Sequence, residues 1–269
     1  MIAPKKRSKL RIFLGKSYYT LRRRLHWRFG GVKFTSKKDN NPFPYIYSSH
    51  SSPLLRQLKD VDMWLQYNKI TNLQLAVPKV NDVIIYPGET FSYWKLIGKP
   101  TKSKGYKAGM ILFAGSMKEG VGGGLCQLSN LIYWMTLHTP LTIVERYRHS
   151  YDVFPDSKRT QPFGSGATCV YNYRDLMIRN DTGQPFQLKI WLSDSNLNGC
   201  WRVNYKPTEY YEVFEKDHYF KKELFGQYSR HNTIYRKLYD NQENEIAEEY
   251  VTENHALMMY EPFLMEKPK

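Results

Sequence analysis

The chain has 269 residues, of which 41% are hydrophobic, and its formal net charge is +15. This length suits one large domain, or one domain with a smaller appendage, and the apolar content is enough for a buried core. The longest apolar runs are far below the roughly 18 to 20 residues of a membrane-spanning helix, so the sequence excludes an integral helical membrane protein.

The positive charge is concentrated in an N-terminal arm. Residues 1–38 hold thirteen Lys or Arg and no acid, so the rest of the chain accounts for only two net positive charges. Within Tyr18–Phe29, the residues Leu21, Leu25 and Phe29 recur every four positions among arginines, which predicts a basic amphipathic helix. Such a helix suits an anionic membrane surface, and the alternatives are a solvated tail or a helix packed on the domain. Charge alone would also attract nucleic acid, but we do not expect a nucleic-acid partner.

The segment after the arm begins as a loop and continues with helices. Asp39–Ser52 is rich in Pro, Ser and Asn, which is typical of a loop. We expect one helix over Pro53–Tyr67, capped by Ser52, and a second over Asn72–Val80 that is strained or ended by Pro78. Short apolar and alternating patterns predict strands at Val83–Tyr86, Met110–Ala114, Leu141–Tyr147, Ala167–Tyr173, Asp175–Arg179 and Phe186–Leu192.

The clearest helix of the sequence spans Gln127–His138 and stops before Pro140. Its apolar residues mark one buried face, formed by Leu128, Leu131, Ile132 and Met135. From Pro207 on, charged and aromatic residues alternate, which predicts antiparallel strands with turns near Gly226, Asn232 and Asp240–Asn244.

Together these elements predict an α+β fold. We expect an antiparallel sheet with a buried cysteine-bearing helix and an N-terminal helix, plus a strand-rich C-terminal extension. The expected organisation is a basic arm at residues 1–38, a central domain at 39–206 and the extension at 207–269.

A glycine-rich turn directly before the clearest helix is the strongest candidate for chemistry. It reads Gly120-Val-Gly-Gly-Gly-Leu-Cys126-Gln127. The positive end of the helix dipole should lower the pKa of a thiol at Cys126 and favour a nucleophilic thiolate. We expect the amides of Gly122, Gly123 and Gly124 to bind an oxyanion, with assistance from Gln127.

A thiolate needs a base or an ion-pair partner, and His149 is the best candidate. It lies just beyond the strand that follows the helix, and this strand is long enough to return to the start of the helix. Asp152 and Asp175 are the alternatives for a third group that orients the imidazole. In the non-catalytic alternative, Cys126 is a small buried apolar residue and His149 caps a strand or a turn.

We expect neither a metal nor a cofactor. The sequence has no Cys-x-x-Cys, no His-Glu-x-x-His, no paired acidic loop and no phosphate-binding loop. Cys169 and Cys200 fall in strand-like surroundings and are expected in the core. No export signal is recognisable, so we expect three reduced thiols and a cytoplasmic protein, with peripheral attachment to the inner membrane face through the arm.

Several segments with ordered spacing resemble the VanW family, which is named for an accessory protein of the vancomycin-resistance clusters. They are Pro87-Gly-Glu-Thr-Phe-Ser92, Gly120–Gln127, Ile143–Arg146 with His149-Ser150, and Arg179-Asn-Asp-Thr-Gly183. The resemblance extends from about Pro53 to Lys206 and implies a role in the cell wall and in glycopeptide resistance.

In some exported members of this family, the domain is associated with peptidoglycan cross-linking of the L,D-transpeptidase type through the motif cysteine. For this chain, the resemblance implies a cysteine acyl-transfer enzyme that acts on cell-wall peptides or precursors, with Cys126 as the nucleophile. Members often carry Asp within Gly164–Thr168, where this chain has Gly166. If that acid orients the histidine in the family, this chain must use another group for it or is impaired. The alternative function is a non-catalytic module that binds a cell-wall precursor or an anionic ligand at the membrane surface.

Overall fold

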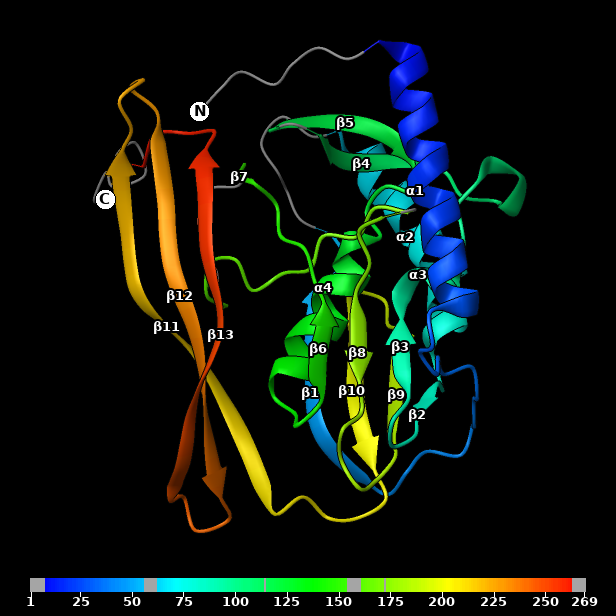
Figure 1. The fold of residues 1–269 in the computed structure, drawn as a ribbon, viewed down its shortest axis with the longest axis vertical. Coiled ribbons are helices and arrows are strands. Elements are labelled where there is room, and N and C mark those ends of the chain that lie inside the picture. Colours follow the sequence, from blue (N-terminus) through cyan, green and yellow to red (C-terminus); the bar gives the residue numbers. More distant parts are fainter. Residues whose placement is uncertain (1–7, 56–61, 114, 154–160, 172, 263–269) are drawn as a thin grey trace.

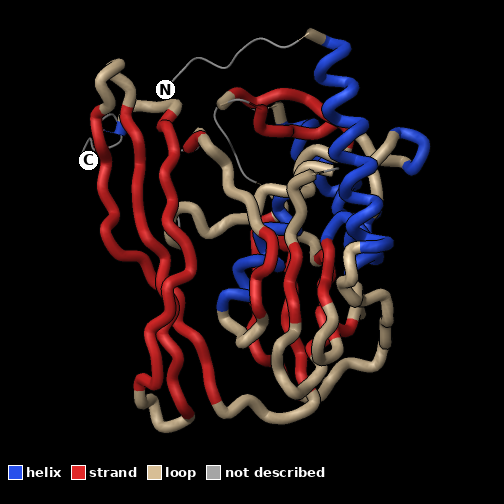
Figure 2. Tube along the Cα trace, viewed as in Figure 1, coloured by secondary structure: helices blue, strands red, loops and turns tan. Residues whose placement is uncertain are grey.

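The protein has an α+β fold, as its sequence predicts. The computed structural model describes residues 8–55, 62–113, 115–153, 161–171 and 173–262, and Figures 1 and 2 show the arrangement of their elements. The helices are α1 (Lys9–Phe29), α2 (Met63–Val80), α3 (Tyr93–Ile97) and α4 (Cys126–Leu137), with a 3-10 turn at Lys102–Lys104.

Four groups of paired strands accompany the helices. The first sheet has the order β1-β10-β9-β2, with β1 at Tyr45–Pro53, β10 at Asn196–Val203, β9 at Phe186–Leu192 and β2 at Ile84–Ile85. The second has the order β3-β8-β6, with β3 at Thr90–Ser92, β8 at Met177–Arg179 and β6 at Thr142–Glu145. The hairpin of β4 and β5 spans Ala108–Phe113 and Ser116–Val121. The last sheet has the order β11-β12-β13-β7, at Glu209–Lys222, Tyr228–Asp240, Glu245–Met258 and Tyr151–Asp152.

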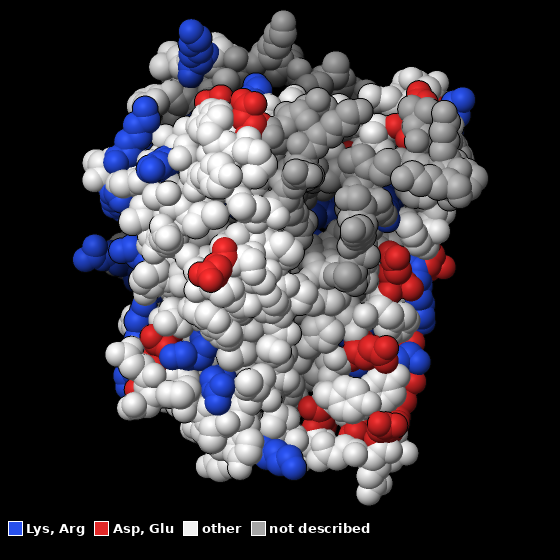
Figure 3. Space-filling model, turned by 180° about the vertical axis from the view of Figure 1, so that it is seen from behind, with Lys and Arg blue, Asp and Glu red and all other residues white. Residues whose placement is uncertain are grey.

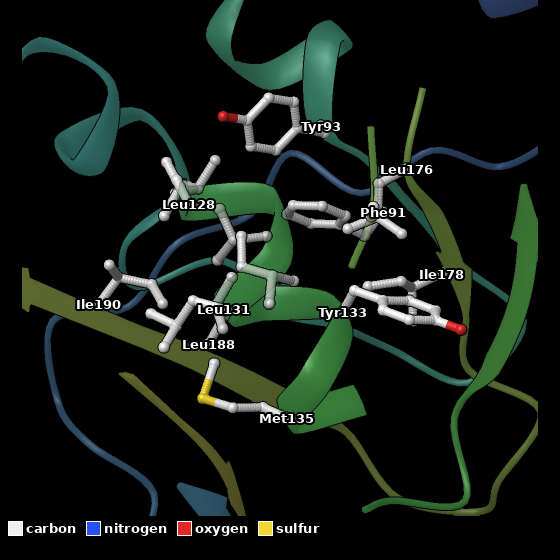
Figure 4. Packing of buried hydrophobic residues seen from close by; sticks show 14 of the residues in the cluster. Phe91, Tyr93, Leu128, Leu131, Tyr133, Met135, Leu176, Ile178, Leu188 and Ile190 are labelled. Atoms are coloured by element: carbon white, nitrogen blue, oxygen red, sulfur yellow. The ribbon is translucent and has the colours of Figure 1, made fainter. Parts of the chain in front are cut away.

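Helix α4 forms the centre of the hydrophobic core. Its apolar residues recur every three or four positions, so they share one side of the helix, and the predicted face is buried. Figure 4 shows α4 between two groups of side chains. Leu188 and Ile190 of β9 lie on one side, and Phe91 of β3 and Ile178 of β8 lie on the other. This packing fixes the first residue of α4, Cys126, relative to both sheets.

The predictions for residues 39–67 are wrong. Tyr45–Pro53 is not a loop but strand β1, which pairs antiparallel with β10. Its serines suit a strand because the buried Ser48 donates a hydrogen bond of 2.9 Å to Met135 O, while the next serine, Ser49, is exposed. The predicted helix start at Pro53 is therefore the end of a strand, and part of that predicted helix, residues 56–61, lies outside the described residues.

Helix α2 replaces the two predicted helices with one. It begins after Asp62 and continues without a break to Val80, so Pro78 lies inside its last turn. A proline removes one hydrogen bond to the turn before it, which costs least close to the end of a helix. Pro78 is therefore tolerated where the sequence suggested a stop.

Two further predictions along the chain are wrong. Ala167–Tyr173 contains no regular strand in its described part and forms only an isolated bridge between Val170 and Arg174. The predicted turn at Asn232 lies inside β12, because Asn232 Nδ2 donates 2.8 Å to Phe163 O and so has a buried partner. The turns at Gly226 and at 240–244 are confirmed.

The three long strands β11, β12 and β13 form a sheet beside the central domain (Figure 1). Residues 209–258 hold eleven Asp or Glu and six Lys or Arg, so this sheet is acidic. Figure 3 shows acidic side chains gathered over it, while basic side chains gather along the opposite edge of the molecule. The sheet is attached through β7, which pairs parallel with β13, and through Arg236, which donates 2.7 Å to Thr139 O behind α4.

Helix α1 is longer than the predicted Tyr18–Phe29 and packs by one side against the domain. Arg23 forms a two-pronged ion pair with Glu145 of β6, with nitrogen–oxygen distances of 2.7 and 2.5 Å. The rings of Trp27 and Tyr171 lie 6.4 Å apart. No helix among the described residues combines the length and the apolar character needed to cross a membrane.

Candidate active site around Cys126

The glycine turn is held in place by a close crossing of two backbones. A Cβ added to Gly123 would lie 2.1 Å from the carbonyl carbon of Gly109, so only glycine fits there. Asn72 of α2 is fully buried, and its Nδ2 donates to the carbonyl oxygens of Gly123 at 2.9 Å and Lys107 at 3.1 Å. Asn72 thus ties the turn to α2 and to the start of β4.

The predicted oxyanion donors are already engaged. The amides of Gly122, Gly123 and Gly124 donate at 3.0 Å each to the carbonyl oxygens of Lys107, Gly120 and Met110. These three glycine amides therefore cannot form the predicted oxyanion hole or anion nest. The turn is glycine-rich because it must cross another backbone closely and because Gly122 and Gly124 have positive φ angles.

Cys126 is the first residue of α4 and is half-buried. Its Sγ lies 4.0 Å from the carbonyl oxygen of Cys169. Burial raises the pKa of the Cys126 thiol. Hydrogen bonding with the backbone of Cys169 and of Cys126 itself lowers this pKa, but by less than burial raises it. The prediction of a lowered thiol pKa is therefore wrong, because desolvation of the thiolate outweighs the favourable backbone groups.

The residues that surround the sulfur include two that the sequence did not suggest. Cys169 is buried beside Cys126, although 43 residues separate them in the chain. Tyr93 of α3 is fully buried and donates 2.8 Å to the carbonyl oxygen of Leu125, directly before the cysteine. Burial raises the pKa of both the Tyr93 hydroxyl and the Cys169 thiol, so these groups are neutral at pH 7. No short-range spacing in the sequence marks either residue.

His149 is a half-buried, neutral imidazole. Burial, together with the positive charges of Arg174 and Arg146, lowers its pKa to about 4. Within the described residues, His149 shares no hydrogen bond with Cys126. The loop that carries His149 is tied to the segment before Cys169, because Thr168 N donates 2.7 Å to Tyr147 O. The thiol of Cys126 and the imidazole of His149 are both neutral at rest, so they do not form an ion pair.

The two candidate third groups are committed elsewhere. Asp175 accepts hydrogen bonds from Ser92 Oγ at 2.6 Å and from the amides of Trp94 and Leu176 at 2.9 Å. Asp152 is buried and accepts 2.8 Å from Tyr260 and 3.5 Å from Arg230. The prediction that either carboxylate orients His149 is therefore wrong, since Asp175 instead fixes the start of α3 and Asp152 fixes the C-terminal sheet.

Gln127 fastens the start of α4 to the end of β1. Its Nε2 donates 2.9 Å to Ser52 Oγ and 2.8 Å to Pro53 O. Its Oε1 is buried and has no hydrogen-bond partner among the described residues. The side chain therefore positions the helix start, and its amide nitrogen is already engaged by β1.

One turn along α4, the side chain of Asn130 reaches the backbone at Gly166 and Ala167. Its Oδ1 accepts 2.8 Å from the amide of Ala167, and a Cβ on Gly166 would lie 2.8 Å from that oxygen. Gly166 is thus required because the Asn130 side chain fills the space beside it.

In the described part of the chain, no three His, Cys, Asp or Glu side chains are grouped in a way that could hold a metal ion. All three cysteines are free thiols. The described groups at this position are therefore the thiol of Cys126 itself, the buried Cys169 and backbone groups of the turn and of α4.

Comparison with known proteins places this site in a family. The family model described as "VanW like protein" matches residues 68–202. The chain is 34% identical to the vancomycin B-type resistance protein VanW of Enterococcus faecalis over 201 aligned residues. The aligned segment covers 75% of this chain and 73% of that protein. The chain belongs to the VanW family.

The VanW match covers the elements from α2 to β10 and so includes the glycine turn, Cys126 and His149. It leaves α1 and the acidic C-terminal sheet outside. A second relative, the uncharacterized protein YoaR of Bacillus subtilis, is 33% identical over 118 residues, or 44% of this chain and 37% of that protein. No solved structure gives a significant match.

Proposed function

We propose that this VanW-family protein acts in resistance to glycopeptide antibiotics of the vancomycin type. The role named for the Enterococcus faecalis relative supports this proposal, because the similarity extends over about three quarters of both chains. Vancomycin resistance concerns the peptide part of the cell wall, so the substrate class we propose is a cell-wall peptide or its precursor.

Within that role, Cys126 is the nucleophile of an acyl transfer. The observation that carries this proposal is the position of the cysteine at the first turn of the buried helix α4. Cys126 is half-buried, and the amide of Leu125 donates to no acceptor in the described part of the chain. The amides of Leu125 and Cys126, rather than those of the glycines, are then the main-chain donors nearest to a developing oxyanion.

The reaction has two steps. The sulfur of Cys126 attacks a peptide carbonyl carbon, so that a C–S bond forms while the C–N bond breaks, and the thiol proton leaves with the amine. An acceptor amine then attacks the thioester, forms a new C–N bond and returns a proton to the sulfur. Because the resting thiol is neutral, a base must remove its proton as the bond forms, and the neutral imidazole of His149 is the base in this proposal.

The test is to detect the acyl-enzyme. The full chain is incubated with a synthetic cell-wall peptide that ends in D-alanine, and intact-protein mass spectrometry follows the adduct. We expect the mass of a thioester on the wild type, none on Cys126→Ser, and an unchanged adduct on Cys200→Ser, since Cys200 lies within β10 and not at the start of α4. An adduct that persists in Cys126→Ser would exclude this cysteine as the nucleophile.

The raised pKa of Cys126 gives a second expected result. Without peptide, the rate of alkylation by iodoacetamide should be lower at pH 7 than that of a free cysteine, and it should keep rising above pH 9. The pH profile of alkylation in Cys169→Ser/Cys200→Ser, where only Cys126 remains, measures this. A rate that is already maximal at pH 7 would mean that the thiol is ionised in the resting protein.

A second candidate function is the binding of an anionic ligand without chemistry. It is favoured by Arg174, whose guanidinium lies over the rings of Tyr147 and Tyr173 and forms no ion pair with a described carboxylate. In that case Arg174→Gln should abolish binding of the D-alanine peptide in calorimetry, whereas Cys126→Ser should leave the binding unchanged.

A further inference from the structure

One side of helix α1 faces the domain and the other faces solvent. The side chains of Thr20, Arg23 and Trp27 are half-buried, and they lie on the same side of the helix. Arg23 forms the ion pair with Glu145, which is shielded from solvent on both partners. This side anchors the helix, so its orientation relative to the domain is fixed.

The opposite side of α1 is an exposed apolar stripe. It consists of Leu10, Leu14, Leu21 and Leu25, which are 66, 57, 58 and 48% exposed. At 3.6 residues per turn, these four leucines fall within about 60° around the helix axis. Four leucines on one exposed stripe are unusual for a protein surface in water and mark a surface that contacts something apolar.

Positive charge borders this stripe on both sides. Arg24 and Arg28 lie along one edge, Arg11 and Arg22 lie along the other, and all four side chains are exposed. The helix holds seven Lys or Arg and no acid. A surface with leucines in the middle and arginines at the rim matches the boundary between acyl chains and anionic headgroups.

We propose that α1 is a membrane-surface anchor that lies in the plane of an anionic lipid bilayer, with its leucine stripe inserted below the headgroups. The charge pattern favours lipid over the other occupants. A second copy of the chain would bring the same positive charge to the interface, and nucleic acid would leave the leucines in water. The acidic sheet of β11, β12 and β13 lies on the far side of the molecule from α1, where it avoids the anionic surface (Figures 1 and 3).

This anchor is independent of the chemistry proposed for Cys126. It would hold the VanW domain at a bilayer, which is where lipid-linked cell-wall precursors are found. The helix does not cross the membrane in this proposal, in agreement with its charge content.

Vesicle flotation tests the anchor. The full chain is mixed with phosphatidylcholine vesicles that contain phosphatidylglycerol, and with phosphatidylcholine vesicles alone. We expect binding to the anionic vesicles that weakens as salt is added. In the triple variant Leu14→Ser/Leu21→Ser/Leu25→Ser, the apparent affinity for the anionic vesicles should fall at least about tenfold.

The matched control removes three exposed apolar side chains elsewhere. Leu224→Ser/Phe225→Ser/Ile246→Ser lies in the C-terminal sheet region, where these residues are also exposed, and should bind vesicles like the wild type. If the leucine variant loses helix content, then Arg11→Gln/Arg22→Gln/Arg24→Gln/Arg28→Gln provides a second test, and it should also lose binding. The proposal is overturned if the leucine variant binds as the wild type does. It is also overturned if the chain binds duplex DNA but not vesicles, or if the leucine substitutions merely convert a dimer into monomers.

Discussion

Replacement of Gly123 by alanine is expected to lower the free energy of unfolding by about 3 kcal/mol, the largest effect of any single methyl group added near the site. The new Cβ would lie 2.1 Å from the carbonyl carbon of Gly109 and 2.2 Å from its oxygen. Both neighbours are backbone atoms of β4, so neither can rotate away as a side chain would. Urea unfolding of the purified chain at pH 7 measures the change.

The chain offers a matched control for this substitution. Gly183 lies in a turn with nothing within 4 Å of the position of an added Cβ, so Gly183→Ala should change the stability by less than about 0.5 kcal/mol. If both variants unfold like the wild type, the close crossing of the turn and β4 does not exist in solution. A loss in Gly123→Ala alone supports the crossing.

This prediction also separates two roles of the glycines. If the glycines served to expose amides for a ligand, Gly123→Ala would weaken binding and leave folding intact. The geometry predicts the opposite, because the amides of all three glycines already donate to backbone carbonyl oxygens. The glycines therefore serve to position Cys126 at the start of α4.

The sequence was sufficient to predict α4 and its buried face. Repetition at three and four residues is a local property, and the glycines before Cys126 mark the helix start, so both could be recognised without tertiary information. Strand β1 was missed because its pattern of serines becomes a strand only through pairing with β10, about 150 residues further along. Local patterns cannot report a partner that distant.

Only part of the site could be predicted, again because the rest depends on contacts between distant parts of the chain. Cys126 does begin the helix, but whether its thiol ionises depends on how much of it is buried, and burial is a tertiary property. Cys169 and Tyr93 approach the cysteine from other elements, so no spacing in the sequence could identify them. Asp175 was placed near His149 from sequence order alone, whereas Ser92 and α3 hold it.

Replacement of His149 by glutamine is expected to remove an acid-sensitive contribution to stability. In the folded protein, burial and the charges of Arg174 and Arg146 lower the pKa of His149 to about 4, below its ordinary value near 6.5. The unfolded chain therefore binds the proton first as the pH falls. The contribution is fully present above about pH 6.5 and is lost on acidification through about pH 4, and it amounts to about 2 kcal/mol after allowance for partial exposure.

Asp175 should act in the opposite direction over nearly the same range. Burial raises its pKa to about 6, although hydrogen bonds from Ser92 and Trp94 and the charge of Arg23 act against the shift. Here the folded protein binds the proton first, so the contribution is present below about pH 4 and is lost as the pH rises through about 6. Its size is about 2 to 3 kcal/mol.

The two contributions largely cancel in the wild type between about pH 4 and 6, so single variants are needed to reveal either of them. In His149→Gln, urea unfolding should show stability that falls as the pH rises through this range, because only the Asp175 contribution remains. In Asp175→Asn, where an amide replaces the carboxyl, stability should instead rise through the range, because only the His149 contribution remains. Parallel profiles for the wild type and both variants would mean that neither group is buried as described. A changed slope in one variant alone would identify which of the two groups is buried and which is open to water.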